Sequence, residues 1–441
     1  MGIEFSHSTK LRKAAALILS RKGKIWLGRR GATRFLPGFS VFPGGASEKG
    51  ESFEDTARRE TFEETGLQLT AEDLLLPFAR AHTPPYSKFR FDVRVYRLEL
   101  ELGREPTPDG HEFVDGLWAS PQDFFHARTT GEIQLAPPTY RQLLLWEACH
   151  NKTANWPNQA EANAIPPMRN EAVLPFPPGL TVVPLHIQCM PPSMWTNTVI
   201  LGEKNLYIVD PGGQDQAPLK RELKRLKNQG AEVVGVILTH HHRDHIDGYL
   251  ELELDHLPLF CHAITDPLLP PEFPSRTILA DQETMTIEPG LTLKAHFTPG
   301  HAPGHLAFEL VERKALLAGD MISSLSSIVI PSDNGDLCDY LDSLRRLRRL
   351  ECQLVVPSHG PPVGGSSDPF GLALQHRQKR EQQVLKLLEK GEQSVKDITQ
   401  ILYRGLDSRL VPAATANTKQ QLWKLEKEGH ARKLNEKWAL C

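Results

Sequence analysis

The sequence predicts a multidomain α+β chain, and three observations lead to this fold class. The chain has 441 residues, enough for about two to four domains at roughly 100–200 residues each. Residues 151–178 are rich in Pro, Asn and Ala and have no apolar period, which is typical of a linker. One acidic and one histidine-rich cluster lie on opposite sides of this linker. The sequence therefore predicts separate catalytic domains before and after it.

The overall composition is that of an ordinary water-soluble protein. Hydrophobic residues make up 40% and charged residues 24% of the chain. The net charge of -3 indicates neither a dedicated nucleic-acid binder nor a membrane-surface protein. The apolar run Ala14–Leu19 is too short to span a bilayer and is better interpreted as a first strand. We expect a cytoplasmic protein without a membrane partner, with an organelle matrix as the open alternative.

The cysteines do not indicate a disulfide framework. The six of them are scattered and form no C-x-x-C pair. This pattern is typical of reduced thiols, and it disfavours a cysteine-based structural zinc site.

The acidic cluster has the geometry of a cation site. Glu60, Glu63 and Glu64 are spaced i, i+3 and i+4, so on a helix they project from one face. Carboxylates this close repel one another unless a cation or an arginine neutralises them. Mg²⁺ or Mn²⁺ is the natural partner of clustered carboxylate oxygens, and Arg59 can pair with a neighbouring carboxylate. A solvated acidic helix face is the alternative.

The segment Gly45–Leu67 resembles the Nudix box, G-x5-E-x7-R-E-U-x-E-E-x-G-U, at every fixed position. Its one departure is Thr61, where the family usually has an aliphatic residue. The resemblance implies a Nudix domain over residues 1–150, an α/β/α sandwich that hydrolyses a nucleoside diphosphate-linked substrate. It also implies that Glu60, Glu63 and Glu64 are catalytic and hold Mg²⁺ or Mn²⁺.

The flanks of this segment supply further candidates. Glu112 is a candidate additional metal ligand or base. Arg29, Arg30 and Arg34 are candidates for holding phosphates, although ordinary surface arginines are an equal alternative. The approach to the box looks somewhat like that of coenzyme A pyrophosphatases.

The histidine-rich cluster follows the buried-strand signal Val233–Leu238. It reads His240-His241-His242-Arg243-Asp244-His245, a density of imidazole and carboxylate that packing alone does not require. Such side chains on a tight loop can converge on a metal. Three further candidates each come after an apolar run: His301, Asp320 and His359.

Together these residues resemble the metallo-β-lactamase superfamily, with its H-x-H-x-D-H motif followed by H, D and H in order. The resemblance implies an αββα sandwich over residues 179–365 and two metals, expected to be Zn²⁺. One would be held by His240, His242 and His301, the other by Asp244, His245 and His359, with Asp320 bridging. Asp244 is also expected to be catalytic, and a hydroxide between the metals would be the nucleophile.

Two other histidines of this region stay outside the ligand pattern. His241 lies at a variable position of the motif and is not expected to be a ligand. His305 either supports the ligands from behind, faces the substrate side or packs at a strand end.

The tail, residues 366–441, predicts helices over 375–390, 394–403 and 418–428 and a hairpin over 429–440, which is the order of a winged helix. From Gly371 onward it carries 14 Lys/Arg and 8 Asp/Glu, a net charge of +6. Its last helix carries Lys419, Lys424 and Lys427, which can contact phosphates. Packing against the catalytic domain, or dimerisation, is an equally weighted alternative.

Residues 179–441 resemble metallo-β-lactamase-like proteins that end in a winged helix, the best known of which are endoribonucleases on single-stranded RNA. Those relatives lack a Nudix domain, so three hypotheses stay open. The first is a bifunctional hydrolase: a Nudix pyrophosphatase joined to a di-zinc hydrolase that cleaves RNA. The second is a thioester hydrolase of acyl-CoA or glutathione metabolism, similar to glyoxalase II. The third is a nucleic-acid-binding sensor with an inactive Nudix domain. The expected partners are a nucleoside diphosphate or coenzyme A-type small molecule and single-stranded RNA; the sequence predicts no oligomeric state.

Overall fold

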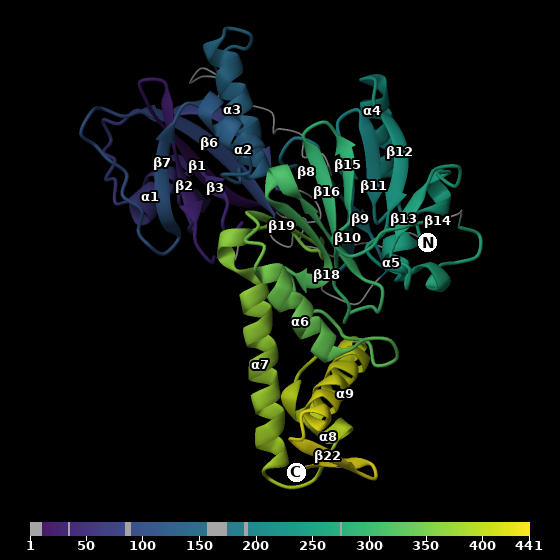
Figure 1. Ribbon diagram of the computed structural model, residues 1–441. Coiled ribbons are helices and arrows are strands. Elements are labelled where there is room, and N and C mark those ends of the chain that lie inside the picture. Colours follow the sequence, from purple (N-terminus) through teal and green to yellow (C-terminus); the bar gives the residue numbers. More distant parts are fainter. Residues whose placement is uncertain (1–10, 34–35, 84–89, 157–173, 189–192, 274–275) are drawn as a thin grey trace, which may run out of the picture. The chain divides into compact units, whose positions relative to one another are not determined.

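The computed structural model (Figure 1) describes residues 11–33, 36–83, 90–156, 174–188, 193–273 and 276–441. The chain divides into two compact units, Met1–Pro178 and Gly179–Cys441. Most of the predicted linker, residues 157–173, lies outside the described residues. Just before that gap, Trp156 packs against the core of the first unit. A search of the described helices finds none with the length and apolar character needed to span a membrane.

The first unit is built on a mixed sheet with the strand order β3-β2-β1-β6-β5, in which β4 pairs with β1 and β7 with β2. Helix α1 packs against β1, and helices α2 and α3 supply Phe124 and Trp146 to the core around Phe78. The predicted α/β/α sandwich is therefore confirmed. Its elements are β1 Arg12–Arg21, β2 Lys24–Arg30, β3 Ser40–Val41, β4 Gly44–Ala46, α1 Phe53–Thr65, β5 Leu76–His82, β6 Phe91–Glu99, β7 Phe113–Ala119, α2 Pro121–Thr129 and α3 Pro137–His150.

Helix α1 carries the acidic cluster, and local sequence sets both of its ends. The Ser52 side chain accepts a hydrogen bond from the Asp55 N–H at its start. Gly66 ends the helix with φ 64°, a left-handed conformation that favours glycine. Thr61, the unusual residue of the box, is fully buried, and its hydroxyl donates to the Ala57 carbonyl at 2.7 Å. The polar atom that replaces an aliphatic carbon is thus satisfied inside the helix.

The second unit contains two sheets, ordered β14-β13-β12-β11-β10-β9 and β15-β16-β17-β18-β19-β20. Helix α4 packs on the first sheet, and α6 packs on the second through a core that includes Tyr340 and Leu344. This is the predicted αββα sandwich. The bounds are β9 Leu180–His186, β10 Trp195–Leu201, β11 Asn205–Val209, α4 Ala217–Asn228, β12 Glu232–Ile237, α5 Arg243–Ile246, β13 Leu259–Cys261, β14 Arg276–Ile278, β15 Thr284–Glu288, β16 Leu291–Phe297, β17 Leu306–Leu310, β18 Ala315–Ser323, α6 Leu337–Arg348, β19 Leu354–His359 and β20 Val363–Gly364. The short strand β8, Leu174–Pro175, belongs to the first unit.

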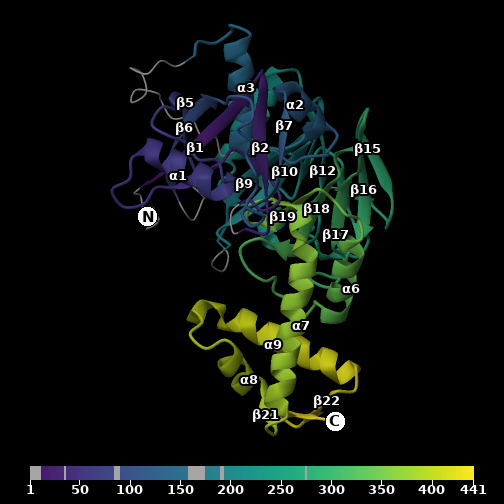
Figure 2. The same ribbon diagram turned by 90° about the vertical axis from the view of Figure 1, so that its left-hand side faces the viewer.

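The chain ends in the predicted winged helix, in which α9 crosses the long helix α7 (Figure 2). Its core joins apolar side chains of α7, α8 and α9 to Trp438 of the hairpin. The last helix begins at Val411, seven residues before the predicted start, because Pro412 suits a first helical turn and alanines follow it. The elements are α7 Pro369–Leu388, β21 Gln393–Ser394, α8 Val395–Leu402, α9 Val411–Lys427, β22 Ala431–Leu434 and β23 Lys437–Leu440.

The cysteines that the structure describes are free thiols. Burial raises the pKa of Cys261 and of Cys352 to about 12, so neither is a thiolate at neutral pH. Cys189 lies outside the described residues.

Candidate active sites

The predicted histidine site lies where strands of both sheets of the second unit end. His240 and His242 follow β12, and Asp244 and His245 lie in the short helix α5. The other three candidates come from the second sheet: His301 follows β16, Asp320 lies in β18 and His359 ends β19. The fold thus brings all seven predicted ligands from four segments to one place.

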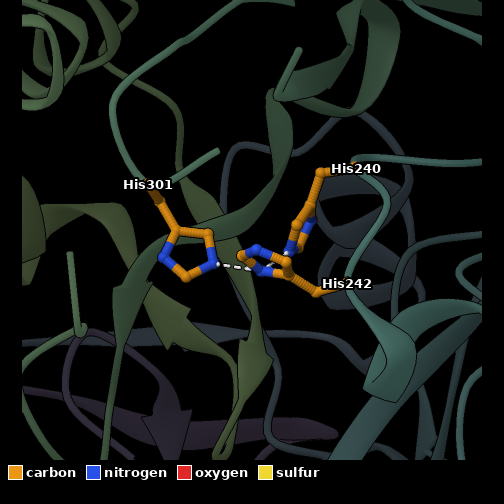
Figure 3. A group of neighbouring side chains, drawn as sticks. All are labelled: His240, His242 and His301. Atoms are coloured by element: carbon orange, nitrogen blue, oxygen red, sulfur yellow. Dashed lines mark hydrogen bonds between the residues drawn. The ribbon is translucent and has the colours of Figure 1, made fainter. Parts of the chain in front are cut away.

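Three of these histidines converge on one point (Figure 3). His242 Nδ1 lies 3.0 Å from His240 Nε2 and 2.9 Å from His301 Nε2. One proton can satisfy only one of these two close nitrogen pairs, whereas a cation accepts all three lone pairs. The arrangement fits a metal ion bound by three imidazoles.

A second group lies beside the first and is joined to it by Asp320. His359 Nε2 lies 3.2 Å and His245 Nε2 3.8 Å from Asp244 Oδ2. Asp320 directs Oδ2 toward His301 at 3.4 Å and Oδ1 toward His359, also at 3.4 Å. Its two oxygens therefore face the two groups separately, as a bridging ligand would.

Neighbouring groups fix the protonation of the histidine rings. His301 Nδ1 donates to the Val329 carbonyl at 2.8 Å, and His359 Nδ1 donates to the Trp195 carbonyl at 3.0 Å. Each bond assigns a proton to Nδ1 and turns Nε2 toward the centre. His245 Nε2 and Asp320 Oδ1 are buried without a hydrogen-bond partner. Buried polar atoms are rarely left unsatisfied, so these two support the fit to a cation.

Burial and the clustering of imidazoles keep two of the candidate ligands neutral. Desolvation, reinforced by neighbouring histidines, lowers the pKa of His242 to about 3 and that of His240 well below its ordinary value. The neutral ring is the form that binds metal. Desolvation also opposes a charge on His245, but Asp244 and Asp210 raise its pKa to about 10. The second group is therefore the more strongly anionic of the two.

Asp210 is a site residue that the sequence did not identify as one. It accepts hydrogen bonds from the Thr239 N–H at 2.8 Å, the Thr239 hydroxyl at 2.6 Å and His245 Nδ1 at 2.9 Å. The Thr239 hydroxyl in turn accepts from His240 Nδ1 at 2.9 Å. Asp210 thus orients His245 directly and His240 through Thr239. Its place at the end of the strand β11, before Pro-Gly-Gly, was the available sequence signal.

The two histidines outside the ligand pattern have different surroundings. His305 is fully buried, and its Nε2 accepts the Asp320 N–H at 3.1 Å while Nδ1 donates to the Thr298 hydroxyl at 2.8 Å. It therefore supports the bridging carboxylate from inside the fold and does not face the substrate side. His241 is half-buried, and its Nδ1 has no hydrogen-bond partner.

The acidic site of the first unit is organised around Arg59. Its guanidinium contacts Glu60 at 3.0 Å, Glu63 at 2.8 Å and Glu51 at 2.9 Å. Glu51, whose carboxylate is held mainly by this arginine, has its pKa lowered to about 2. Among the residues that the structure describes, the donor groups that converge tightly enough for a metal all belong to the histidine site. In the acidic site, Arg59 lies between the carboxylates of Glu60 and Glu63. Mg²⁺ often takes some of its ligands from water and substrate phosphates, so a magnesium site does not require protein donors that converge as tightly.

Glu64 has other partners than Glu60 and Glu63 in this site. It accepts the Gly44 N–H at 2.8 Å and lies 3.5 Å from Arg30, which also contacts Glu112 at 3.1 Å. Glu112, a candidate from the sequence, is thus held beside the box. Arg29 pairs with Asp115, and Arg34 lies outside the described residues.

The Glu60 carboxyl group lies close against Gly45. A Cβ at Gly45 would lie 2.5 Å from the Glu60 carboxyl group. A side chain at this position of the box would therefore displace the Glu60 carboxylate.

Glu64 gives a prediction about pH. Desolvation raises its pKa from 4.5 to about 8, against the Gly44 hydrogen bond and Arg30, which lower it. The folded protein thus binds this proton more tightly than the unfolded chain. Its stabilising effect is complete below about pH 4.5 and is lost as the pH rises through about 8, at about 1.4 kcal/mol per unit of pKa shift. In chelator, calorimetric unfolding from about pH 5 to 9 should show a decline in wild type that is weaker in Glu64→Gln. Parallel stability curves for the two proteins would contradict this prediction.

Comparison with known proteins agrees with this architecture. The family model described as the metallo-beta-lactamase superfamily matches residues 196–359, the NUDIX domain model matches 9–142, and the beta-lactamase associated winged helix domain model matches 394–438. The lactamase-like protein adaB of Aspergillus niger is 30% identical over 248 residues, which are 53% of this chain and 75% of that protein. The chain belongs to the metallo-beta-lactamase superfamily. It carries a Nudix domain and a winged-helix domain in addition.

Two further relatives resemble this chain in sequence, and one solved structure shares its fold. A beta-lactamase-like protein 2 homolog of Drosophila melanogaster is 29% identical over 59% of this chain and 94% of its own length. The atrochrysone carboxyl ACP thioesterase of Aspergillus fumigatus is 30% identical over 44% of this chain and 60% of its own length. A beta-lactamase domain protein from Burkholderia ambifaria shares the fold, with a TM-score of 0.53, 19% identity, and coverage of 62% of this chain and 95% of that one.

The superfamily and the Nudix domain establish the coarse function. This metallo-beta-lactamase superfamily member is a hydrolase, as its sequence predicted. Both folds generally use divalent metals, and both domain types imply small-molecule substrates.

Proposed function

We propose that the histidine site binds two Zn²⁺ ions and hydrolyses thioesters of the acyl-CoA class. The observation that carries the proposal is the pair of three-ligand groups that share Asp320. One relative is named as a thioesterase, which supports this substrate class. The two ions would supply Lewis-acid activation of water and polarise the thioester carbonyl.

The chain's own residues would divide the remaining tasks. His240, His242 and His301 hold one ion, and Asp244, His245 and His359 hold the other, as the sequence implied. Among the carboxylates of the site, Asp244 is the more exposed, at 25% of its side chain against 8% for Asp320. An Oδ atom of Asp244 is thus placed to accept a hydrogen bond from the attacking water and to orient it. His305 and Asp210 hold the ligands in position from behind.

For the first unit we propose hydrolysis of the pyrophosphate linkage in the same class of compound. Glu60, Glu63 and Glu64 would hold Mg²⁺ or Mn²⁺ together with substrate phosphates. Coenzyme A carries both a pyrophosphate and the thiol of the thioester, so one chain would act on both ends of such a molecule. The intact carboxylates of the box disfavour an inactive sensing domain.

Cleavage of single-stranded RNA is the second candidate, favoured by the winged helix and its positive charge. The lysines of α9 weaken it. Lys424 is buried and pairs with Glu381 and Glu428, both at 2.6 Å, and Lys427 pairs with Asp336 at 2.6 Å. Two of the three lysines expected to contact phosphates are therefore neutralised within the fold. This favours the thioester substrate.

A hydrolysis screen separates the candidates. Wild type, Asp244→Ala and the matched control Asp247→Ala are assayed on an acyl-CoA, a single-stranded RNA and a nucleoside diphosphate compound. Asp247 lies at the end of the same short helix and pairs with the exposed Arg243, at 3.2 Å. We expect wild type and the control to cleave the thioester, and Asp244→Ala to lose at least about a hundredfold in rate. RNA cleavage that depends on Asp244, without thioester cleavage, would reverse the order of the two candidates.

A further inference from the structure

The segment Ile328–Ile330 joins the histidine site to the C-terminal helices. It lies between β18 and α6, and its middle residue, Val329, accepts the hydrogen bond from His301 Nδ1 at 2.8 Å. That bond fixes both the rotation of the His301 ring and the nitrogen that faces the centre. The position of His301 therefore depends on where this segment is held.

Side chains from two C-terminal helices hold the segment on both sides of Val329. Arg377 of α7 donates from Nη2 to the Ile328 carbonyl. On the other side, the Ile330 N–H donates to Asn417 Oδ1 of α9 at 3.0 Å. Arg377 Nη1 also donates to this oxygen, at 3.3 Å, so the two side chains form one network. Both are buried, at 5% and 7% exposure, where water does not compete for these bonds.

The same helix also anchors the chain from this segment to the start of α6. Gln420 of α9 donates from Nε2 to the carbonyls of Pro331, at 2.7 Å, and Gly335, at 2.9 Å. Its Oε1 accepts the Leu337 N–H at 3.2 Å. Figure 1 shows α9 beside α6, where these contacts are made. In many winged helices the third helix contacts nucleic acid. Here part of the polar face of α9 forms hydrogen bonds with other segments of the same chain.

A parallel link reaches the strand of the bridging carboxylate. The Arg377 guanidinium lies 5.1 Å from the centre of the Tyr340 ring. The Tyr340 hydroxyl donates to the Met321 carbonyl at 2.8 Å, directly after Asp320. Arg377 thus contacts two groups that lie next to candidate ligands. One is the Ile328 carbonyl, next to Val329, and the other is Tyr340, which donates to the residue after Asp320.

We propose that Asn417 and Arg377 are positioning residues for the metal bound by His240, His242 and His301, and that they act on His301 through Val329. This rests on the proposed role of His301 as a ligand. The winged-helix tail would then be a structural part of the metal site. Loss of the Asn417 acceptor would free the Ile330 N–H and let the Val329 carbonyl move, which weakens one metal position and spares the other.

The test measures how tightly purified full-length protein retains Zn²⁺ against increasing chelator, together with the melting temperature of the metal-free form. For Asn417→Ala we expect one of the two Zn²⁺ equivalents to be released at a chelator concentration about tenfold lower than in wild type. A tenfold loss of metal affinity is the low end of the range for changes to residues that support the ligands. Asn417→Asp keeps an oxygen acceptor for Ile330 and Arg377 and should behave as wild type. Lys427→Ala, on the same helix but paired with Asp336, should also retain both equivalents.

A double-mutant comparison makes the result specific. In a His301→Ala background, Asn417→Ala should cause no further loss of metal, because both changes act on one position. If Asn417→Ala does not fold, Asn417→Leu replaces it, because leucine fills a similar volume but lacks the acceptor. We expect the same release of one Zn²⁺ equivalent from Asn417→Leu. The proposal would be overturned if Asn417→Ala retained both Zn²⁺ equivalents up to the chelator concentration that wild type withstands. It would also be overturned if the variant released both equivalents equally easily. Full retention by His301→Ala would instead contradict the ligand assignment itself.

Discussion

Asp320→Asn is expected to abolish hydrolysis at the histidine site. The substitution keeps the shape of the side chain but removes the charge that faces both ligand groups, at 3.4 Å from His301 and from His359. The loss should exceed the 10–100-fold that is typical of changes outside the ligand set, so we expect a rate decrease of more than about a hundredfold. Thioester hydrolysis and zinc content, measured on the same sample, should fall together.

The environment of Asp320 explains why its effect should be large. Burial alone would raise the pKa of this carboxyl group, but His359 and His245 outweigh burial and hold the pKa well below its ordinary range. The side chain is therefore a buried anion held between His301 and His359. Asp342→Asn, on the exposed surface of α6 where it pairs with Arg345, is the matched control. A fully active Asp320→Asn protein with two bound zinc ions would disprove the bridging role.

Glu63→Gln is expected to abolish pyrophosphate hydrolysis and to leave the histidine site unaffected. Glu63 is half-exposed and contacts Arg59 at 2.8 Å, so its carboxylate is available to a cation at the surface of the helix α1. Loss of a charged ligand or base should lower the rate by about a hundredfold or more. The thioester activity should stay unchanged because its residues all belong to the second unit.

The control for this variant lies on the same helix. Glu54→Gln changes an exposed carboxylate in the first turn of α1, away from Arg59, and should keep full pyrophosphatase activity. The measurement is phosphate or nucleotide release from a nucleoside diphosphate compound with Mg²⁺, with thioester hydrolysis assayed in parallel. Loss of both activities in Glu63→Gln would show that the two sites are not independent.

Much of this architecture could be predicted from local patterns. The Nudix box occupies one helix and its flanks, so its spacing directly places Glu60, Glu63 and Glu64 on one face. The histidine motif is similar, because four of its seven candidates lie within six residues after one strand. The order of helices and hairpin likewise predicted the winged helix, whereas both sandwiches were implied by the resemblance of the two motifs to known families.

Other features depended on contacts between distant segments. Asp210 lies 35 residues from His245, and Asn417 lies 87 residues from Ile330. The basic residues of α9 look available in the sequence, yet Lys424 is buried between two glutamates. The periodicity of apolar residues along the sequence does not indicate such pairings. They depend on the path of the chain in the fold and on which polar groups burial would otherwise leave without a partner.

The sequence by itself therefore determined the fold class, the two reactive clusters and the candidate ligands, because each depends on short-range spacing along a helix, a strand or a loop. The tertiary structure alone decided how the candidate ligands are held, and which lysines of α9 are paired with carboxylates. It also placed Asn417 of the tail against Ile330, next to the Val329 carbonyl that accepts from His301. The physical reason is that buried hydrogen bonds and ion pairs join atoms brought together only by folding, and their partners leave no local signal.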